Sequence, residues 1–307
     1  MPRPLIIILL ILVFVVPTIF SGILANKFST FEKNQAAAMT KLQDELAAMQ
    51  TKLNEMSETK SEPAPDAETV PDHSEEIGQL QEKIAALESA LNSLNSKTDA
   101  AIHTADFNYL AIGNSITLHG TCDYWWNEIG MAASTQDKDY VHRVISALEA
   151  KYGEVESAAY NFATWEVQAH DRAQTLSLLD PYLYEQLDLV SIQLSENAQD
   201  LTTFEKDFEE LIHYVQERAP KAQIIVVGDF WDANKKTVLK RTAANATGAT
   251  FVSLNDIVGD PEYQSAMGAI VYDPEGGEHE VDHEGVAGHP GDKGMEYIAN
   301  AILGAMK

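Results

Sequence analysis

The chain has 307 residues, enough for one or two domains with additional segments. It contains 21 basic and 47 acidic side chains, which gives a formal net charge of −26 at pH 7. Because nucleic-acid binding needs a basic face, this charge argues against a nucleic-acid partner. The single cysteine, Cys122, excludes an intrachain disulfide and a zinc site built from cysteines.

The N-terminal segment predicts a membrane anchor. Residues 4–25 carry no charge and are almost wholly apolar, and a spanning helix needs about 20 such residues. The alternative is a cleaved signal peptide, but its apolar core is usually only about 7–15 residues long, and residues 23–25 (ILA) form a poor cleavage site. The flanking positive charges give no clear bias in orientation. We expect a single-pass membrane protein whose short head stays inside and whose remaining chain is extracytoplasmic.

Two segments with a heptad pattern follow the anchor. Residues 27–58 and 75–99 place apolar side chains at alternating spacings of three and four, which is typical of a coiled coil. Residues 59–74 between them contain three prolines among mostly polar residues, as expected for a solvated linker. We expect a parallel stalk that forms a homodimer. The alternative is a helix that folds back on the following domain or on its partner helix in the same chain.

Residues 104–307 predict one α/β domain. Apolar strand-like runs alternate with amphipathic helical patterns, and this alternation indicates a parallel sheet covered by helices on both faces. The expected strands are 107–113, 156–161, 187–194, 223–227 and 250–254, and the expected helices are 139–151, 203–218, 232–246 and 292–306. In such a fold the functional site lies beyond the carboxyl ends of the strands.

Two short segments carry the groups for nucleophilic catalysis. Residues 110–117 place Ser115 on a turn after an apolar strand, and residues 288–295 place His289 before a proline at the start of a helix. A serine hydroxyl is a weak nucleophile until a base removes its proton, so a serine hydrolase needs such a pair. Residues 195–197 follow another strand, and we expect them at the same edge of the sheet as Ser115.

These segments resemble sequence blocks of the SGNH/GDSL hydrolase (esterase) superfamily, over roughly residues 104–307. Residues 113–117 (GNSIT) are close to the family's G-D-S-I-T, with Asn114 where aspartate is usual. The resemblance implies a flavodoxin-like three-layer fold, Ser115 as the nucleophile, and the Ser115 backbone N–H as an oxyanion donor. His289 and the proline after it match the family's His-Pro, which implies that His289 is the catalytic base.

Two further blocks match the family in part. Residues 195–198 (SENA) stand where the family has G-x-N-D, so the resemblance implies that the Asn197 amide stabilises the oxyanion. Residues 161–166 (NFATWE) lack both glycines of the family's N-x-G-x-x-G. The resemblance therefore assigns to Glu166 only a backbone N–H, as a second backbone donor to the oxyanion, and its carboxylate would have to point away from the developing charge.

The acid of a catalytic triad has no clear position. The family has an aspartate three residues before the histidine, where this chain has Val286. The candidates are Asp282 and Glu284 in the acidic segment just before it, and the alternative is a Ser–His dyad whose ring is oriented by a backbone carbonyl. His279 and His283 lie in the same segment, but their spacing matches no standard zinc pattern. We expect neither a metal nor another cofactor.

The resemblance implies a carboxylic ester hydrolase, and the anchor directs the expectation to a substrate outside the cytoplasm. We expect an acylated carbohydrate, in which O-acetyl groups on an envelope or extracellular polysaccharide are removed by an esterase or moved by an O-acetyltransferase. One or more of the four tryptophans are candidates for an aromatic floor under a sugar ring or acyl group. They are Trp125, Trp126, Trp165 and Trp231.

Two alternatives remain open at this point. The first is a lipase or another acyl-ester hydrolase that uses the same serine and histidine. The second is a glycan-binding module without catalytic activity, which the departures at Val286, Ala198 and residues 161–166 would explain. A serine-directed reagent separates the second alternative from the enzymes, because a binding module has no activated serine.

Overall fold

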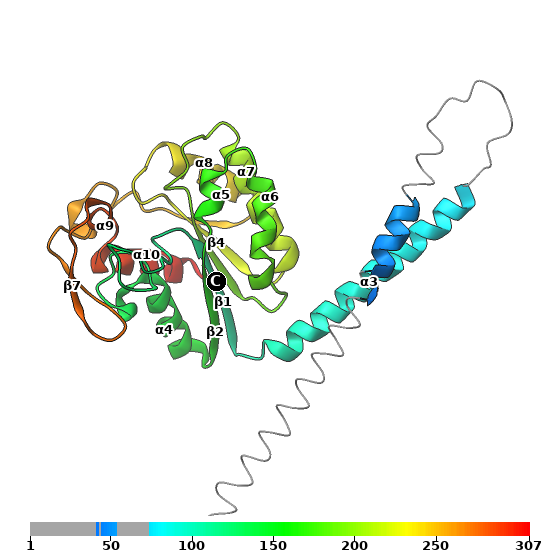
Figure 1. Cartoon of the computed structure of the whole chain (residues 1–307), viewed down its shortest axis with the longest axis horizontal. Coiled ribbons are helices and arrows are strands. Elements are labelled where there is room, and N and C mark those ends of the chain that lie inside the picture. Colours follow the sequence, from blue (N-terminus) through cyan, green and yellow to red (C-terminus); the bar gives the residue numbers. More distant parts are fainter. Residues whose placement is uncertain (1–40, 43, 54–73) are drawn as a thin grey trace, which may run out of the picture. The chain divides into compact units, whose positions relative to one another are not determined.

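The computed structural model describes residues 41–42, 44–53 and 74–307 (Figure 1). Their contacts divide the chain into an N-terminal unit that ends at Ile102 and a C-terminal unit, His103–Lys307. The predicted anchor at residues 4–25 and nearly all of the predicted linker at 59–74 lie outside the described residues. Among the helices that are described, none is long and apolar enough to cross a membrane.

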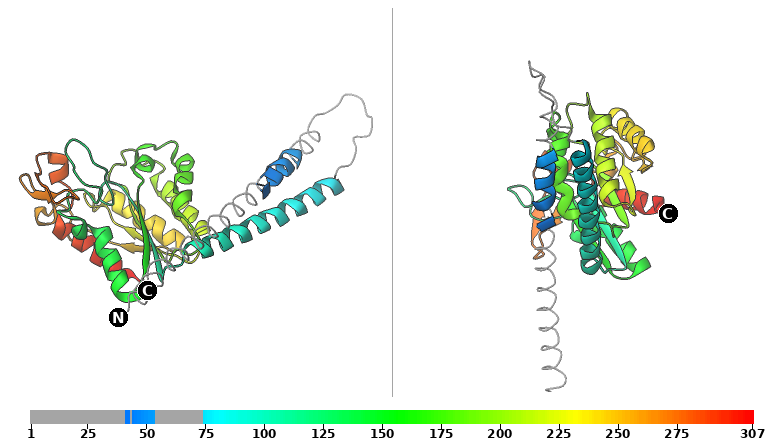
Figure 2. Two further views of the ribbon diagram at one scale, coloured as in Figure 1. Left: turned by 60° about the horizontal axis from the view of Figure 1, so that its bottom comes forward. Right: turned by 90° about the vertical axis from the view of Figure 1, so that its right-hand side faces the viewer.

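The N-terminal unit contains two helical segments, residues 44–53 and α3 (Ser74–Ile102), which lie side by side (Figures 1 and 2). The apolar positions of the heptad pattern are their less exposed side chains, and Leu80 of α3 is buried. Lys52 Nζ lies 3.0 Å from Glu76 Oε1, so the end of the first segment meets the start of α3. This contact favours pairing of two helices within one chain. Parallel self-association of the stalk stays a prediction.

A five-stranded parallel sheet forms the centre of the C-terminal unit, which confirms the predicted α/β fold with a central parallel sheet. Its strand order is β2-β1-β3-β4-β5, the order of flavodoxin-like folds. Because β1 lies between β2 and β3, and β4 lies beside β3, the segments that follow these four strands meet at one edge. The strands are β1 (Phe107–Gly113), β2 (Val155–Asn161), β3 (Leu189–Gln193), β4 (Gln223–Val227) and β5 (Thr250–Val252).

Helices cover both faces of this sheet (Figure 2). On one face, α4 (Tyr140–Tyr152) and α10 (Asp292–Ala305) share a core with Tyr109 and Ala111 of β1. On the other face, α7 (Phe204–Arg218) and α8 (Lys235–Thr247) share a second core with Leu110 and Ile112. All seven residues of β1 are buried, which explains why a strand of a parallel sheet shows a continuous apolar run in the sequence.

Several short elements have no counterpart in the sequence-based prediction. They are η2 (Gln136–Lys138), α5 (Ala163–Val167), α6 (Arg172–Thr175), η3 (Leu176–Tyr182), η4 (Pro261–Tyr263), the antiparallel pair β6 (Ile270–Tyr272) and β7 (Glu278–Glu280), and α9 (Glu284–Ala287). Each is too short to show a clear periodicity. Two of them carry groups of the candidate site, since α5 contains Glu166 and α9 contains Gly285.

The predicted helix at 232–246 begins three residues later than expected. The Asp232 carboxylate accepts hydrogen bonds from the backbone N–H groups of Asn234 and Lys235. Asp232 therefore closes a turn before the helix instead of belonging to its first turn, as aspartate side chains commonly do.

Gly294 allows α10 to approach the loop at Tyr263, and this contact generates a stability prediction. A Cβ at residue 294 would overlap the Tyr263 carbonyl oxygen. We expect Gly294→Ala to lower the free energy of unfolding by about 1–3 kcal/mol, the usual cost of overpacking. Gly304→Ala in the same helix is the control, because no atom lies within 4 Å of its added Cβ. Denaturant unfolding of the two variants would contradict the packing argument if their stabilities were equal.

Candidate active site

The candidate nucleophile lies on a tight turn at the end of β1. The backbone N–H groups of Thr117 and Leu118 both donate to the Asn114 carbonyl, each at 3.0 Å, which places Ser115 at the tip of the turn. Gly113 is required here, because a Cβ would overlap the Thr117 side chain. Among the described residues, the Ser115 N–H has no hydrogen-bond partner. It is therefore available to an oxyanion, as the resemblance implied.

The structure brings the two predicted catalytic residues together. Ser115 Oγ and His289 Nε2 lie 2.7 Å apart, although the residues come from opposite ends of the domain. The backbone of His289 is fixed on both sides, because its N–H donates to the Val286 carbonyl at 3.0 Å and its carbonyl accepts from the Ser265 N–H at 2.8 Å. A hydroxyl in contact with an imidazole is the arrangement that general-base activation of a serine needs.

A backbone carbonyl orients the imidazole. His289 Nδ1 lies 2.6 Å from the carbonyl oxygen of Gly285, which α9 places four residues before the histidine. Since a carbonyl can only accept, Nδ1 carries the proton and Nε2 presents its lone pair to Ser115. Burial lowers the pKa of His289 to about 4, although the Gly285 hydrogen bond opposes this shift. The imidazole is therefore an uncharged base at neutral pH.

Neither candidate acid lies at the imidazole. Asp282 and Glu284 are both exposed, and no described hydrogen bond or ion pair joins either carboxylate to His289. The position that a triad acid would occupy, beside Nδ1, is taken by Gly285. This geometry argues against an acid at 282 or 284 and favours the alternative, a dyad with a carbonyl-oriented ring.

Asn197 follows β3 and is held by a buried carboxylate. Its Nδ2 donates to Glu166 Oε2 at 2.6 Å, and the Ser195 N–H donates to Glu166 Oε1 at 2.5 Å. Glu166 is only 1% exposed. An amide nitrogen carries two protons, so one remains for an oxyanion. The backbone N–H of Glu166 as an oxyanion donor stays a prediction. No pattern in the sequence indicated that the Glu166 carboxylate holds Asn197.

The polar contacts of Asn114 explain why aspartate is absent from this position. Asn114 is fully buried. Its Nδ2 donates to Glu166 Oε1 at 3.0 Å and to Glu196 Oε2 at 2.7 Å, and its Oδ1 accepts from the Ile116 N–H at 3.0 Å. Only an amide can donate to two carboxylates and accept from an N–H. An aspartate would place three carboxylates in contact, which is unfavourable away from water.

Glu196, which accepts from Asn114, is a carboxyl group with a raised pKa. Desolvation and the charge of buried Asp229 raise its pKa to about 7, while the Lys240 ammonium opposes the shift. Glu196 also accepts from the Phe230 N–H at 3.0 Å. This contact links the segment after β4 to the segments after β1 and β3.

Ser195 occupies a backbone conformation that favours glycine, with φ of 144°. Its side chain offsets this cost through buried hydrogen bonds. Ser195 Oγ donates to Asp229 Oδ2 at 2.7 Å and accepts from Lys240 Nζ at 3.3 Å. Burial lowers the pKa of Lys240, and the carboxylates around it, Glu196 first, oppose the shift. Ser195 is thus part of the polar network that supports the site.

Of the four tryptophans, only Trp231 lies at the Ser–His pair. Its ring centroid is 5.1 Å from that of His289 at an interplanar angle of 85°, and its Nε1 donates to the Gly288 carbonyl at 2.9 Å. It is 39% exposed. Trp125 and Trp165 are buried in the two cores. Trp231 is therefore the tryptophan that can contact both the histidine and a substrate.

Two stacked pairs hold the acidic segment against the loop after the nucleophile. Trp126 stacks on His279 at a centroid distance of 4.4 Å, and Tyr124 stacks on His283 at 4.3 Å. His279 Nε2 also lies 2.9 Å from Asp273 Oδ2. Within the described ranges, no group of histidine, cysteine and acidic side chains is arranged to hold a metal ion. These histidines have packing partners that fix the segment leading to α9.

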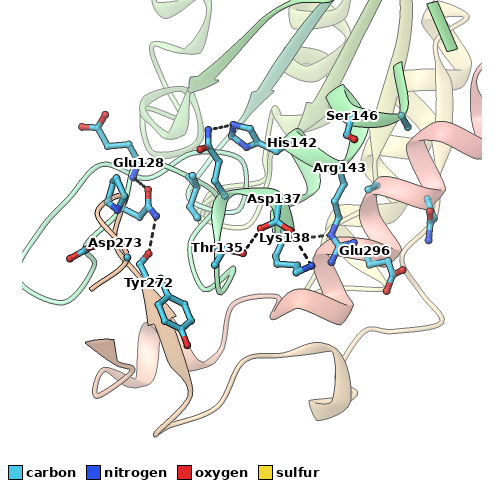
Figure 3. A pocket seen from close by; sticks show the side chains of 18 of the residues that line it. Glu128, Thr135, Asp137, Lys138, His142, Arg143, Ser146, Tyr272, Asp273 and Glu296 are labelled. Atoms are coloured by element: carbon cyan, nitrogen blue, oxygen red, sulfur yellow. Dashed lines mark hydrogen bonds and ion pairs between the residues drawn. The ribbon is translucent and has the colours of Figure 1, made fainter. Parts of the chain in front are cut away.

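A groove of about 1340 Å³ lies between α4, α10 and the β6–β7 turn (Figure 3). Some of the polar side chains that line it are hydrogen-bonded to other lining residues. Arg143 Nε donates to the Lys138 carbonyl, and Asn127 Nδ2 donates to the Tyr272 carbonyl. The residues that line it include neither Ser115 nor His289. The groove is therefore separate from the candidate active site.

No protein family model matches the chain, and no curated protein matches its sequence. Several solved structures are similar to it. The psychrotrophic esterase EstA from Pseudoalteromonas sp. is 14% identical, with 65% of this chain and 96% of that chain covered and a TM-score of 0.42. An acetyl xylan esterase from Geobacillus stearothermophilus is 17% identical, with 66% and 95% covered and a TM-score of 0.41.

A two-domain esterase active on acetylated mannans is 16% identical, with a TM-score of 0.43. The match covers 69% of this chain and 53% of that one, so the chain spans about half the length of this neighbour. We infer function from the geometry of the Ser115–His289 pair itself.

The carbonyl-oriented imidazole generates a prediction about the two exposed acids. A fluorophosphonate labels an activated serine, so the rate at which it labels Ser115 would report how strongly His289 activates the hydroxyl. We expect Asp282→Asn and Glu284→Gln to label at the wild-type rate, because neither carboxylate contacts His289. We expect His289→Ala to label at least roughly 10²-fold more slowly, because the general base is gone. A loss of about 10⁴-fold in either carboxylate variant, the size seen when a triad aspartate is neutralised, would identify it as the acid.

Proposed function

We propose that this protein is a membrane-anchored serine esterase in which Ser115 and His289 form a catalytic dyad. The observation that carries the proposal is the 2.7 Å contact between Ser115 Oγ and His289 Nε2, with Nδ1 held by the Gly285 carbonyl. This tautomer leaves Nε2 free to accept the serine proton. The uncharged imidazole, the free Ser115 N–H and the Asn197 amide supply the other groups that acyl transfer needs.

The reaction has two halves. Ser115 Oγ attacks the ester carbonyl carbon while its proton moves to His289 Nε2, and the resulting oxyanion accepts hydrogen bonds from the Ser115 N–H and from the second amide proton of Asn197. The tetrahedral intermediate collapses, the alcohol leaves with the proton from Nε2, and the acyl group stays on Ser115. Water then attacks the acyl group with His289 as base, which releases the acid and restores the serine.

A neutral carbonyl at His289 Nδ1, in place of the carboxylate of a triad, changes how well the imidazolium is stabilised. The carbonyl fixes the ring and its tautomer, but it stabilises the imidazolium less than a charged acid would. The lowered pKa of His289 agrees with this weaker stabilisation, because no carboxylate offsets the effect of burial, which disfavours the protonated ring. The ring of Trp231, beside the imidazole, helps to fix its plane without adding charge. The enzyme gains a base that is unprotonated over a wide pH range.

For the substrate, we propose an O-acetylated polysaccharide outside the cytoplasm. Trp231 supports this class, because an exposed aromatic ring beside the catalytic histidine suits packing against a sugar ring. The apolar, uncharged residues 4–25 support an anchored and exported enzyme. An esterase transfers the acetyl group to water, and a transferase would give it to a sugar hydroxyl in the same second step. A preference for long-chain esters over acetyl esters would favour a lipase instead.

The Ser–His assignment predicts that both residues are essential for hydrolysis of p-nitrophenyl acetate. We expect Ser115→Ala and His289→Ala to lower kcat/KM by roughly 10³-fold or more, since each removes half of a unit that acts together. Ser146→Ala and His213→Ala are matched controls, because both residues are exposed and lie in the middle of α4 and α7. Wild-type protein that neither hydrolyses the ester nor reacts with a fluorophosphonate would instead support the non-catalytic glycan-binding module.

The pKa of His289 predicts the pH dependence. The active form is the neutral imidazole, and the pKa of about 4 lies below the usual 6.5. We therefore expect kcat/KM to hold its value as pH falls through 6.5 and to decline only as pH approaches about 4, with tryptophan fluorescence showing that the fold persists. An acid limb centred near 7 would mean that another group, such as Glu196, controls the rate.

A further inference from the structure

We infer that the Glu166 carboxylate is a positioning residue that sets the oxyanion site, and that Asn114 is its obligatory partner. The inference rests on the proposed esterase function, because it concerns how the Asn197 amide is held for that reaction. It assigns one physical reason to two departures from the family blocks, the asparagine at 114 and the glutamate at 166.

Glu166 fixes Asn197 through both its main chain and its side chain. Oε2 accepts from Asn197 Nδ2 at 2.6 Å, and Oε1 accepts from the N–H groups of Ser195 at 2.5 Å and of Asn197 at 3.4 Å. Asn197 itself is exposed, so without this carboxylate its side chain would rotate in solvent. A donor held before the reaction begins costs no reorganisation when negative charge develops.

Asn114 connects the same carboxylate to the nucleophile. Its Nδ2 donates to Glu166 Oε1, and its Oδ1 accepts from the N–H of Ile116, the residue after Ser115. The turn that presents the serine and the loop that presents Asn197 therefore share one buried acceptor. The turn is also closed by the backbone hydrogen bonds from Thr117 and Leu118 to the Asn114 carbonyl, so a change at Glu166 mainly displaces the Asn197 amide.

The negative charge of Glu166 faces away from the reaction. Its two oxygens accept from Asn114, Ser195 and Asn197, so their lone pairs are directed at donors of the protein. This arrangement removes the conflict between a carboxylate and a developing oxyanion, because the carboxylate lies behind the donor. Charge-assisted hydrogen bonds of this kind are short and strong.

The backbone that carries Glu166 is itself fixed by a buried arginine. Arg172 is 2% exposed, and its guanidinium donates to the carbonyls of Trp165, Glu166 and Asp200 at 3.2, 3.3 and 3.0 Å. Its Nη1 also lies 2.8 Å from Asp207 Oδ2. Arg172 thus ties α5 to the loop that follows Asn197 and to the start of α7. These hydrogen bonds fix the backbone of α5, which carries the Glu166 carboxylate.

The test is a double-mutant cycle in the full chain. It compares Glu166→Gln, Asn197→Ala and the double variant by kcat and KM for p-nitrophenyl acetate. We expect each single variant to lower kcat by roughly 10²-fold, the effect of losing one oxyanion donor, with KM unchanged. We expect the double variant to equal Asn197→Ala alone, because Glu166 acts through that amide. Multiplied losses in the double variant, or an unchanged kcat in Glu166→Gln, would overturn the inference.

A reciprocal exchange tests the partnership with Asn114. Asn114→Asp should lower kcat, because it adds a third carboxylate to the cluster. Adding Glu166→Gln to that variant should recover part of the loss, since the new amide can donate to the new carboxylate. Recovery is not expected from a residue that only supports folding. A double variant that is no better than Asn114→Asp would contradict the partnership.

An NMR measurement tests the inference even if the protein is inactive in the assay or the Glu166→Gln variant does not fold. In the wild-type protein, the two side-chain amide protons of Asn197 should resonate further apart by NMR than those of a solvent-exposed asparagine, because one donates to a carboxylate and the other does not. The exposed side chain of Asn234 is the control. Equivalent spectra for the two side chains would overturn the inference. Inactive wild-type protein with a well-separated Asn197 pair would contradict the proposed esterase and leave the role of Glu166 supported.

Discussion

The hydrogen bond between Ser115 and His289 is the interaction on which the functional account depends. It joins the turn after β1 to the segment before α10, across 174 residues of sequence. The parallel sheet makes this possible, because β1 lies inside it, between β2 and β3, and presents its carboxyl end where the other loops converge. The short helix α9 then supplies the second requirement by placing the Gly285 carbonyl at Nδ1. The reactive pair is thus fixed by one long-range contact and one local contact.

Beneath this pair lies a buried polar cluster whose members depend on one another. Glu166 and Glu196 both accept from the Asn114 amide. Asp229 accepts from Ser195 Oγ, which in turn accepts from Lys240 Nζ. Desolvation and the charge of Asp229 raise the pKa of Glu196, so a further negative charge would be unfavourable there. Amide, hydroxyl and ammonium groups therefore occupy positions where an additional acid would repel. Ser195 has an unfavourable φ, and its buried hydrogen bond to Asp229 offsets this cost.

Much of this arrangement could be predicted from the sequence, and the remainder has physical reasons for being hidden. Strands β1 and β4 begin and end at the predicted residues, because buried parallel strands are continuous apolar runs between turn signals. The pairing of Ser115 with His289 could be predicted because the Ser115 motif follows a predicted strand and the His289 motif precedes a predicted helix. The Gly285 carbonyl had no residue signature, since every residue has a carbonyl. Asp282 and Glu284 were reasonable acids by spacing, but exposure and direction are tertiary properties. The Glu166 carboxylate was hidden because α5 is one short turn whose contacts come from distant loops.

The most direct test of the account is to trap the acyl-enzyme. Full-length protein mixed with p-nitrophenyl acetate would be quenched in acid during turnover and digested, and the peptides would be mapped by mass spectrometry. The account predicts a single acetyl group on the peptide that contains Ser115, which disappears in Ser115→Ala and accumulates if deacylation is slow. Hydrolysis that proceeds without acetyl on Ser115, or with acetyl on another residue, would contradict the dyad as the catalytic centre.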